Sequence, residues 1–138
     1  MKVYFATSNT SKVANAQAAL APFGIAVEQI AIDLVESRSE DPAVIALEKA
    51  RQAYAKLRRP VIVEDSGFFI RALGDFPKTH IRLSLNTLGV ANILKMLKGV
   101  KDRHAEWRMT LAYVSGPHQF KTFTYVERGE IAKSRRPV

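Results

Sequence analysis

Glu64 and Asp65 are adjacent acids at the end of the β-branched run in PVIVEDSGFF (60–69). A run of this kind is typical of a buried strand, and the turn-forming residues Ser66 and Gly67 come next. Hard divalent cations take oxygen ligands, and Mg²⁺ is usually held by one or two carboxylates together with substrate phosphates. The two acids therefore predict a magnesium site at the end of this strand.

The segment FATSNTSK (5–12) is a second candidate, because its side chains and backbone suit an anion. A strand end that enters a helix presents free N–H groups, and the helix dipole favours negative charge there. Lys12 adds a full positive charge in the first turn. The segment thus predicts phosphate binding, with the alternative that Thr10 or Ser11 merely caps the helix; it lacks the glycines of a P-loop or dinucleotide fingerprint.

The acid pair also carries a geometric condition. Successive side chains on a strand point to opposite faces, so Glu64 and Asp65 share a metal only if the strand has already bent there. Ser66 and Gly67 are compatible with such a bend. Without it, one acid faces the ligand and the other pairs with a lysine or arginine as part of the framework.

Net charge of +8 implies attraction to anions, while the acids are concentrated in one part of the chain. Seven of the 13 fall between positions 33 and 65, namely Asp33, Glu36, Glu40, Asp41, Glu48, Glu64 and Asp65. An acidic pocket on a basic protein predicts a cation site. The alternative is that Asp41 caps a helix and that Glu36 and Glu48 are solvated.

Length and composition predict one domain over residues 1–138, with 47% hydrophobic and 25% charged residues. No apolar stretch approaches the roughly 18 residues of a membrane span, and MKVYFATSN is no signal peptide. Cysteine is absent, which excludes disulfides and thiol chemistry and fits a reducing compartment. We therefore expect a cytoplasmic protein with no membrane association.

The candidate residues must be positioned by alternating strands and helices. The patterns predict strands over 3–6, 26–32 and 61–64, helices over 11–21, 41–57, 79–88 and 90–98, and a hairpin of 106–115 with 120–130. The buried stripe of the second helix is predicted to be Val44, Leu47, Ala50, Tyr54 and Leu57. This order predicts an α/β fold with a mixed sheet flanked by helices, and its ligand outside the carboxyl ends of the strands.

Several segments together resemble one family. FATSNTSKV, the acidic loop with Glu40, EKA (48–50) and KLRRPVIVEDSGFFIRALGDFP (56–77) occur in the order found in the Ham1-type inosine/xanthosine triphosphate pyrophosphatases. The resemblance is collinear over about the first 100 residues, and GEIAKSRRP fits weakly beyond them. It implies a Ham1/Maf-like fold with a twisted mixed sheet.

The resemblance also implies a reaction and a set of site residues. The family uses Mg²⁺ to hydrolyse non-standard purine nucleoside triphosphates to the monophosphate and pyrophosphate. The residues that match its phosphate-binding positions are Thr7, Asn9, Lys12 and Lys49, to which we add Ser66. The acids that match its metal and water-activating positions are Glu40, Glu64 and Asp65. Asp65 is the expected base, and Lys49 is expected to act with it in catalysis.

The chain also departs from the family pattern. After GDFP a glycine is usual, where this chain has Lys78, and the family's later aromatic-glycine-aspartate and Ser-His-Arg motifs are absent. The sequence thus predicts a C-terminally shortened member whose base specificity does not follow from the resemblance. Sheet edges exposed by lost neighbours predict a homodimer.

Two functions from different classes follow. The favoured one is a Mg²⁺-dependent nucleoside triphosphate pyrophosphatase, which the presence of Lys49 and Asp65 supports. The alternative is a non-catalytic nucleotide- or nucleic-acid-binding module, which the positive charge and missing motifs support. The aromatic residues of the hairpin are expected in the core or a dimer contact; they are Trp107, Tyr113, Phe120, Phe123 and Tyr125.

Overall fold

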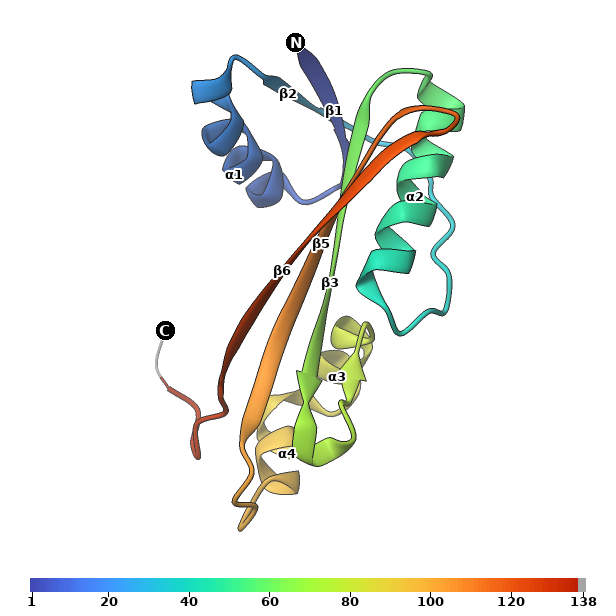
Figure 1. The fold of residues 1–138 in the computed structure, drawn as a ribbon. Helices are drawn as coiled ribbons and strands as arrows, with labels where there is room; N and C mark the ends of the chain where they lie inside the picture. Colours follow the sequence, from blue (N-terminus) through green and yellow to red (C-terminus); the bar gives the residue numbers. More distant parts are fainter. Residues whose placement is uncertain (137–138) are drawn as a thin grey trace. The chain divides into compact units, whose positions relative to one another are not determined.

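The computed structural model describes residues 1–136, whose strands form a mixed sheet (Figure 1). The strands are β1 (Lys2–Ala6), β2 (Ala26–Ile30), β3 (Val61–Ile70), β4 (Pro77–Lys78), β5 (His104–Gly116) and β6 (Gln119–Glu130). Their order is β2-β1-β3-β5-β6, with β4 on β3. β1 pairs in parallel with β2 and β3, whereas β4 is antiparallel to β3, so the predicted mixed α/β sheet is confirmed.

The helices lie close to their predicted positions. They are α1 (Thr10–Leu20), α2 (Pro42–Leu57), α3 (Ile81–Thr87) and α4 (Gly89–Met96), with short 3₁₀ turns at Ala21–Phe23 and Arg71–Leu73. The predicted hairpin is also confirmed, because β5 and β6 are sheet neighbours joined by two residues. Local periodicity and turn residues were therefore sufficient to locate these elements.

Strand β3 is the main departure from the sequence prediction. It runs for ten residues and continues through Ser66 and Gly67, where a turn was expected. Gly67 serves packing instead, because a Cβ at this position would lie 2.7 Å from the Phe69 ring and 3.1 Å from the Lys78 carbonyl oxygen. The glycine thus allows close approach within the strand rather than a bend.

The chain forms two compact units that alternate along the sequence. Unit 1 comprises 1–38, 43–65 and 110–124; unit 2 comprises 39–42, 66–109 and the chain from Tyr125 onward. The boundary within β3 falls directly after Asp65. The single domain over 1–138 stays a prediction, and the two units are described separately below.

Unit 1 has a core on each face of its strands, with α1 and α2 on opposite sides (Figure 1). Its α2 face buries Ala46, Ala50, Ala53, Val61 and Val63, and its α1 face buries Val3, Phe5, Val13, Val27 and Ile62. The predicted α2 stripe is wrong at Val44, which is 41% exposed, while Ile45 is buried. Three alanines form much of the actual stripe, and their small size allows close packing of helix and sheet.

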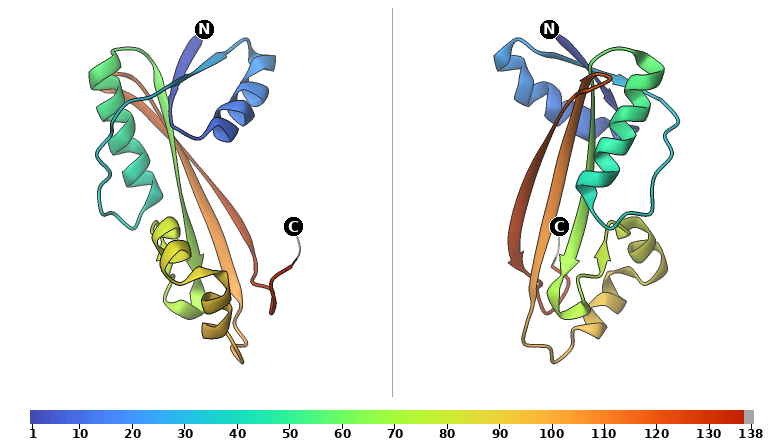
Figure 2. Two further views of the ribbon diagram at one scale, coloured as in Figure 1. Left: turned by 180° about the vertical axis from the view of Figure 1, so that it is seen from behind. Right: turned by 45° about the vertical axis from the view of Figure 1, so that its right-hand side comes forward.

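Unit 2 packs α3 and α4 beside the second part of β3 (Figure 2). Ile70, Leu97 and Ala105 are the buried residues at the centre of its apolar core. No helix within residues 1–136 is long and apolar enough to span a bilayer.

The aromatic residues of β6 do not follow the expectation of a core position. Phe120, Phe123 and Tyr125 are 49%, 54% and 60% exposed. Trp107 is also 39% exposed, although it packs on Phe68 at 4.7 Å between ring centroids, and Tyr113 is partly buried against the α1-side core. β6 is the last strand in the order of the sheet, and its three exposed aromatic residues are not members of the apolar cores described above.

Candidate active site

Asp65 is the most perturbed ionisable side chain of unit 1. Its Oδ2 atom is buried and has no hydrogen-bond partner among the described residues. Burial raises the pKa of Asp65 to about 6, against opposing effects from the charges of Lys49 and Lys12 and reinforcing effects from Glu36 and Glu64. A buried carboxylate oxygen without a partner is costly in a folded protein, which makes Asp65 a candidate functional residue.

The two acids of β3 lie on different faces of the strand. Val63 packs against α2, whereas Ile62 packs against α1, and strand alternation continues this pattern to the acids. Glu64 accordingly pairs with Lys12 of α1, with 3.4 Å between Nζ and Oε1. The bend after Glu64 and Asp65 is absent. Glu64 instead pairs with a lysine, as predicted for one of the two acids if the strand stayed straight.

Lys49 reaches the site from α2, whose buried alanines place this side of the helix against the sheet. It pairs with Glu36 at 3.1 Å and is only 22% exposed in its side chain. Glu36 is therefore a charged partner rather than simply solvated. The Oγ atom of Ser37 is also buried without a hydrogen-bond partner among the described residues. Sequence reasoning missed Ser37, because an irregular loop gives no periodic signal for burial.

The predicted phosphate turn is ordered by its own side chains. Asn9 Oδ1 accepts hydrogen bonds from the N–H groups of Ser11 and Lys12 at 3.0 and 3.2 Å, so Asn9 caps α1. Asn9 N–H donates to Thr7 Oγ1 at 3.1 Å. The alternative that Thr10 or Ser11 caps the helix is therefore wrong. Capping by Asn9 fixes the start of α1 and with it the position of Lys12.

The parallel pairing of β1 and β3 relates this turn to the acids. Tyr4 is level with Val61 and Phe5 with Ile62. Extending this register by two residues brings Thr7 level with Glu64. The turn follows the carboxyl end of β1, where ligands bind in open α/β sheets, and it lies level with the acids inside β3.

Glu40 and Ser66 belong to unit 2, whereas the other candidates belong to unit 1. Lys78 donates to Glu40 at 2.7 Å, and this hydrogen bond and charge lower the pKa of the Glu40 carboxyl. The Thr79 hydroxyl donates to the Ser39 carbonyl at 2.7 Å, which holds the same loop. Within residues 1–136, no three His, Asp or Glu side chains gather in a way that could hold a metal ion.

Unit 1 thus combines acids and lysines in one cluster, which we call the Asp65 cluster; its members are Lys12, Glu36, Lys49, Glu64 and Asp65. Lysine ammonium groups can neutralise phosphate oxygens, and a carboxylate of raised pKa can accept a proton near neutral pH. This combination suits hydrolysis of a phosphate ester or anhydride.

Comparison with known proteins agrees with this chemistry. Residues 3–137 match the model of the Ham1 family. The chain is 41% identical over 136 residues to a dITP/XTP pyrophosphatase of Methanopyrus kandleri. This alignment covers 99% of this chain and 72% of that protein. It is 35% identical to a dITP/XTP pyrophosphatase of Saccharolobus solfataricus, at 99% and 70% coverage.

Comparison with solved structures supports the fold. The Staphylococcus aureus Ham1 protein superposes with a TM-score of 0.85 at 22% identity, covering 99% of this chain and 74% of that one. A dITP/XTP pyrophosphatase from Mycobacterium abscessus gives 0.81 at 22% identity, with 96% and 75% coverage. The twisted sheet flanked by helices is confirmed, whereas these comparisons do not support the expected C-terminal truncation. The chain belongs to the Ham1 family.

Proposed function

We propose that this protein is a hydrolase that splits non-standard purine nucleoside triphosphates into the nucleoside monophosphate and pyrophosphate. The observation that carries the proposal is the Asp65 carboxylate, buried and lacking a partner for Oδ2 beside the charges of Lys49 and Lys12. The relatives named dITP/XTP pyrophosphatase support dITP and XTP as substrates. No observation favours the non-catalytic alternative.

In the proposed reaction Asp65 accepts a proton from water as the water oxygen attacks the α-phosphorus. The bond between the α-phosphorus and the bridging oxygen breaks, and pyrophosphate leaves. Lys12 and Lys49 would stabilise the charge that develops on the phosphate oxygens. Thr7, Asn9 and Ser66 are proposed as further phosphate contacts.

Mg²⁺ is the proposed cofactor, and the donor set of unit 1 fits it. Mg²⁺ needs few protein ligands when phosphates supply the rest, and a buried carboxylate oxygen with no partner is a suitable one. Asp65 is the first proposed ligand and Glu40 the second. Glu64 lies on the opposite face of β3 and would join them only if the strand bent after it. When bound, the metal would neutralise phosphate charge. Glu64 and Glu40 would each have to exchange a lysine partner for the metal.

A homodimer and a cytoplasmic location complete the proposal. The exposed aromatic side chains of β6 support the dimer, because such residues on the last strand of a sheet are suited to pairing between copies. Light scattering at micromolar concentration tests this part separately. A stable monomer would exclude the dimer and leave the proposed reaction unaffected.

The reaction is tested by measuring pyrophosphate release from dITP, XTP and ITP, with GTP and ATP for comparison, in Mg²⁺. Glu48→Gln is the matched control for Asp65→Asn, because Glu48 is an exposed acid next to Lys49. We expect release from the first three substrates with the wild type and the control, and little with Asp65→Asn. Equal rates for Asp65→Asn and the wild type would disprove the assignment of the base.

A further inference from the structure

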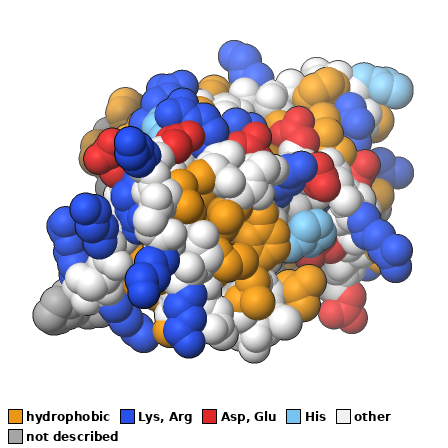
Figure 3. Space-filling view, turned by 90° about the horizontal axis from the view of Figure 1, so that it is seen from below, with side chains coloured by type: hydrophobic (Ala, Val, Ile, Leu, Met, Phe, Trp, Pro, Cys, Tyr) orange, Lys and Arg blue, Asp and Glu red, His pale blue; other side chains and the backbone are white. Residues whose placement is uncertain are grey.

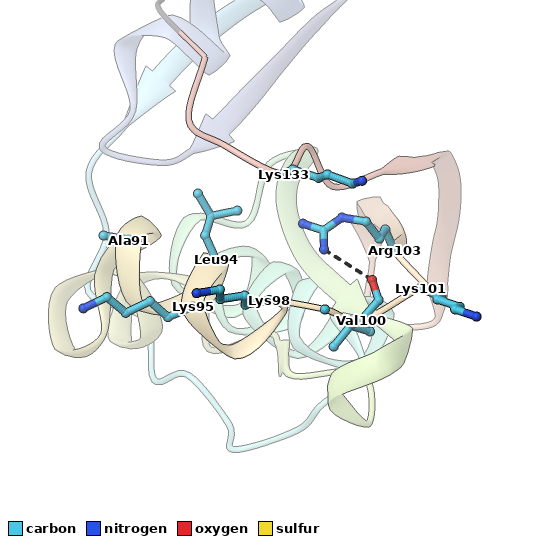
Figure 4. Close-up of a pocket in the computed structure, with 9 residues that line it drawn as sticks. Ala91, Leu94, Lys95, Lys98, Val100, Lys101, Arg103 and Lys133 are labelled. Carbon is cyan, nitrogen blue, oxygen red and sulfur yellow. Dashed lines mark hydrogen bonds between the residues drawn. The ribbon is translucent and has the colours of Figure 1, made fainter.

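Unit 2 contains a cavity of about 700 Å³ that the proposed reaction does not use. Its lining comes from α4, the loop that follows it and the stretch after β6 (Figure 4). The lining residues are Ala91, Leu94, Lys95, Lys98, Gly99, Val100, Lys101, Arg103 and Lys133. Five of the nine are cationic and none is acidic, which differs sharply from the mixed charges of the Asp65 cluster.

Arg103 builds the wall of this cavity. Its guanidinium donates to the carbonyl oxygens of Leu97 and Val100 at 2.9 and 3.5 Å, and to those of Ile131 and Ala132 at 2.8 and 2.9 Å. It therefore ties the loop after α4 to the chain after β6. Gly99, with φ of 76°, provides the left-handed residue at which this loop turns. The cavity is thus held by a hydrogen-bond network rather than by flexible lysines alone.

The four lysines of the lining are not neutralised by nearby acids. No ion pair found among residues 1–136 involves Lys95, Lys98, Lys101 or Lys133. Asp102, the acid next in sequence, pairs with Arg71 instead, at 2.8 Å. On the face drawn in Figure 3, Lys and Arg side chains gather beside an apolar area. The cavity consequently has a concentrated positive potential, which raises the local concentration of anions.

We propose that this cavity binds a small anion with several phosphate groups, of the pyrophosphate or triphosphate class. Cationic residues from all three segments line this one cavity, so the positive charge of its lining suits a compact anion with several negative charges. A nucleic acid strand instead needs cations along an extended groove. Lysine is a suitable partner because its ammonium group acts as a point charge toward phosphate oxygens.

The site can be tested by amide NMR of the full chain titrated with inorganic triphosphate in EDTA. We expect the signals of Lys98, Gly99 and Lys101 to shift with saturation. The triple variant Lys98→Ala, Lys101→Ala, Lys133→Ala should weaken this response by about tenfold or more, since it removes most of the unpaired charge. Lys121→Ala, an exposed lysine of β6 outside the cavity, should leave the response unchanged.

Two results would overturn the proposal. One is shifts confined to the turn at Thr7–Lys12 with none around Gly99, which would assign triphosphate binding to the Asp65 cluster alone. The other is a single-stranded oligonucleotide that binds the cavity while triphosphate does not. The spectra of the triple variant also report its folding, so loss of binding by a folded variant supports the site.

Discussion

The Asp65 cluster and the lysine cavity are both charged, but they balance charge differently. In the cluster, Lys12 pairs with Glu64 and Lys49 pairs with Glu36, and these charges act on the half-buried Asp65. The residues that line the cavity include four lysines and Arg103, and no acid is among them.

This difference separates catalysis from simple anion binding. A hydrolytic site needs cations for the phosphate and also a group that accepts a proton, and only the cluster has both. The lysine cavity can attract a phosphate anion, but the residues that line it include no carboxylate or histidine to activate water. Changes at the cluster should therefore alter turnover, and changes at the cavity should alter binding alone.

The largest expected effect is that of Asp65→Asn on pyrophosphate release. Removing a general base typically costs about 10²–10⁴-fold, so we expect kcat for dITP to fall by about a thousandfold. The triple lysine variant of the cavity should keep kcat within about twofold of the wild type, because the residues that line the cavity include no group that could accept the proton from water. A loss of turnover in the cavity variant as large as that of Asp65→Asn would remove the distinction between the two regions.

Lys49→Ala should have the next largest effect. We expect kcat/KM to fall by about 10- to 100-fold, since a charge-assisted contact to the phosphate is lost. Lys49 is also the main charge that lowers the pKa of Asp65, so the acidic limb of the pH–rate profile should move to higher pH. Lys56→Ala on the same helix is the control. A Lys49 variant with an unshifted acidic limb would contradict this coupling.

The pH dependence of stability tests the burial of Asp65 without any substrate. Because its pKa is raised from 3.8 to about 6, the folded state holds the proton more tightly than the unfolded state. Ionisation therefore destabilises the fold, and stability falls as pH rises from about 4 through 6. Lys49, Glu36, Lys12 and Glu64 are the charges that face this carboxyl, and their effects partly oppose each other.

Asp65→Asn removes this ionisation. In EDTA, its melting temperature should exceed that of the wild type by about 3–6 °C at pH 8, and the two should converge near pH 4. Glu48→Gln is expected to follow the wild type at every pH. A constant gap between Asp65→Asn and the wild type would mean that the substitution acts through packing rather than through the buried charge.

Helices and strands with a regular pattern could be predicted from the sequence, whereas the residue at which β3 ends could not. The helices and the β5–β6 hairpin followed from periodicity and turn residues. The length of β3 could not be predicted in this way. Glycine is typical of turns, but Gly67 lies within the strand and allows the Phe69 ring to pack closely. Only the tertiary structure decides between these two uses of glycine.

The site shows the same division. Lys12, Lys49 and Asp65 could be proposed from the sequence because they lie on regular elements with a recognisable motif, and their roles stay predictions. Glu36 and Ser37 lie in the irregular stretch before α2, whose path depends on contacts distant in sequence, such as Gln52 with the backbone of Val35. The opposite faces of Glu64 and Asp65 followed from strand alternation, but only once β3 was known to continue past them.

The smallest expected effect concerns Lys78, which governs whether Glu40 is available to a metal. Lys78 has φ of 57° in the left-handed region, where a non-glycine residue costs about 1 kcal/mol, and its ammonium group pairs with Glu40. Lys78→Gly removes the backbone cost and the ion pair; Lys78→Ala removes only the pair. In urea unfolding, Lys78→Gly should therefore be more stable than Lys78→Ala by about 1 kcal/mol.

Both variants release Glu40, so both should bind Mg²⁺ more tightly if Glu40 is a ligand. Unchanged Mg²⁺ affinity in both would restrict the metal site to the acids of the Asp65 cluster and assign Glu40 to the framework of unit 2.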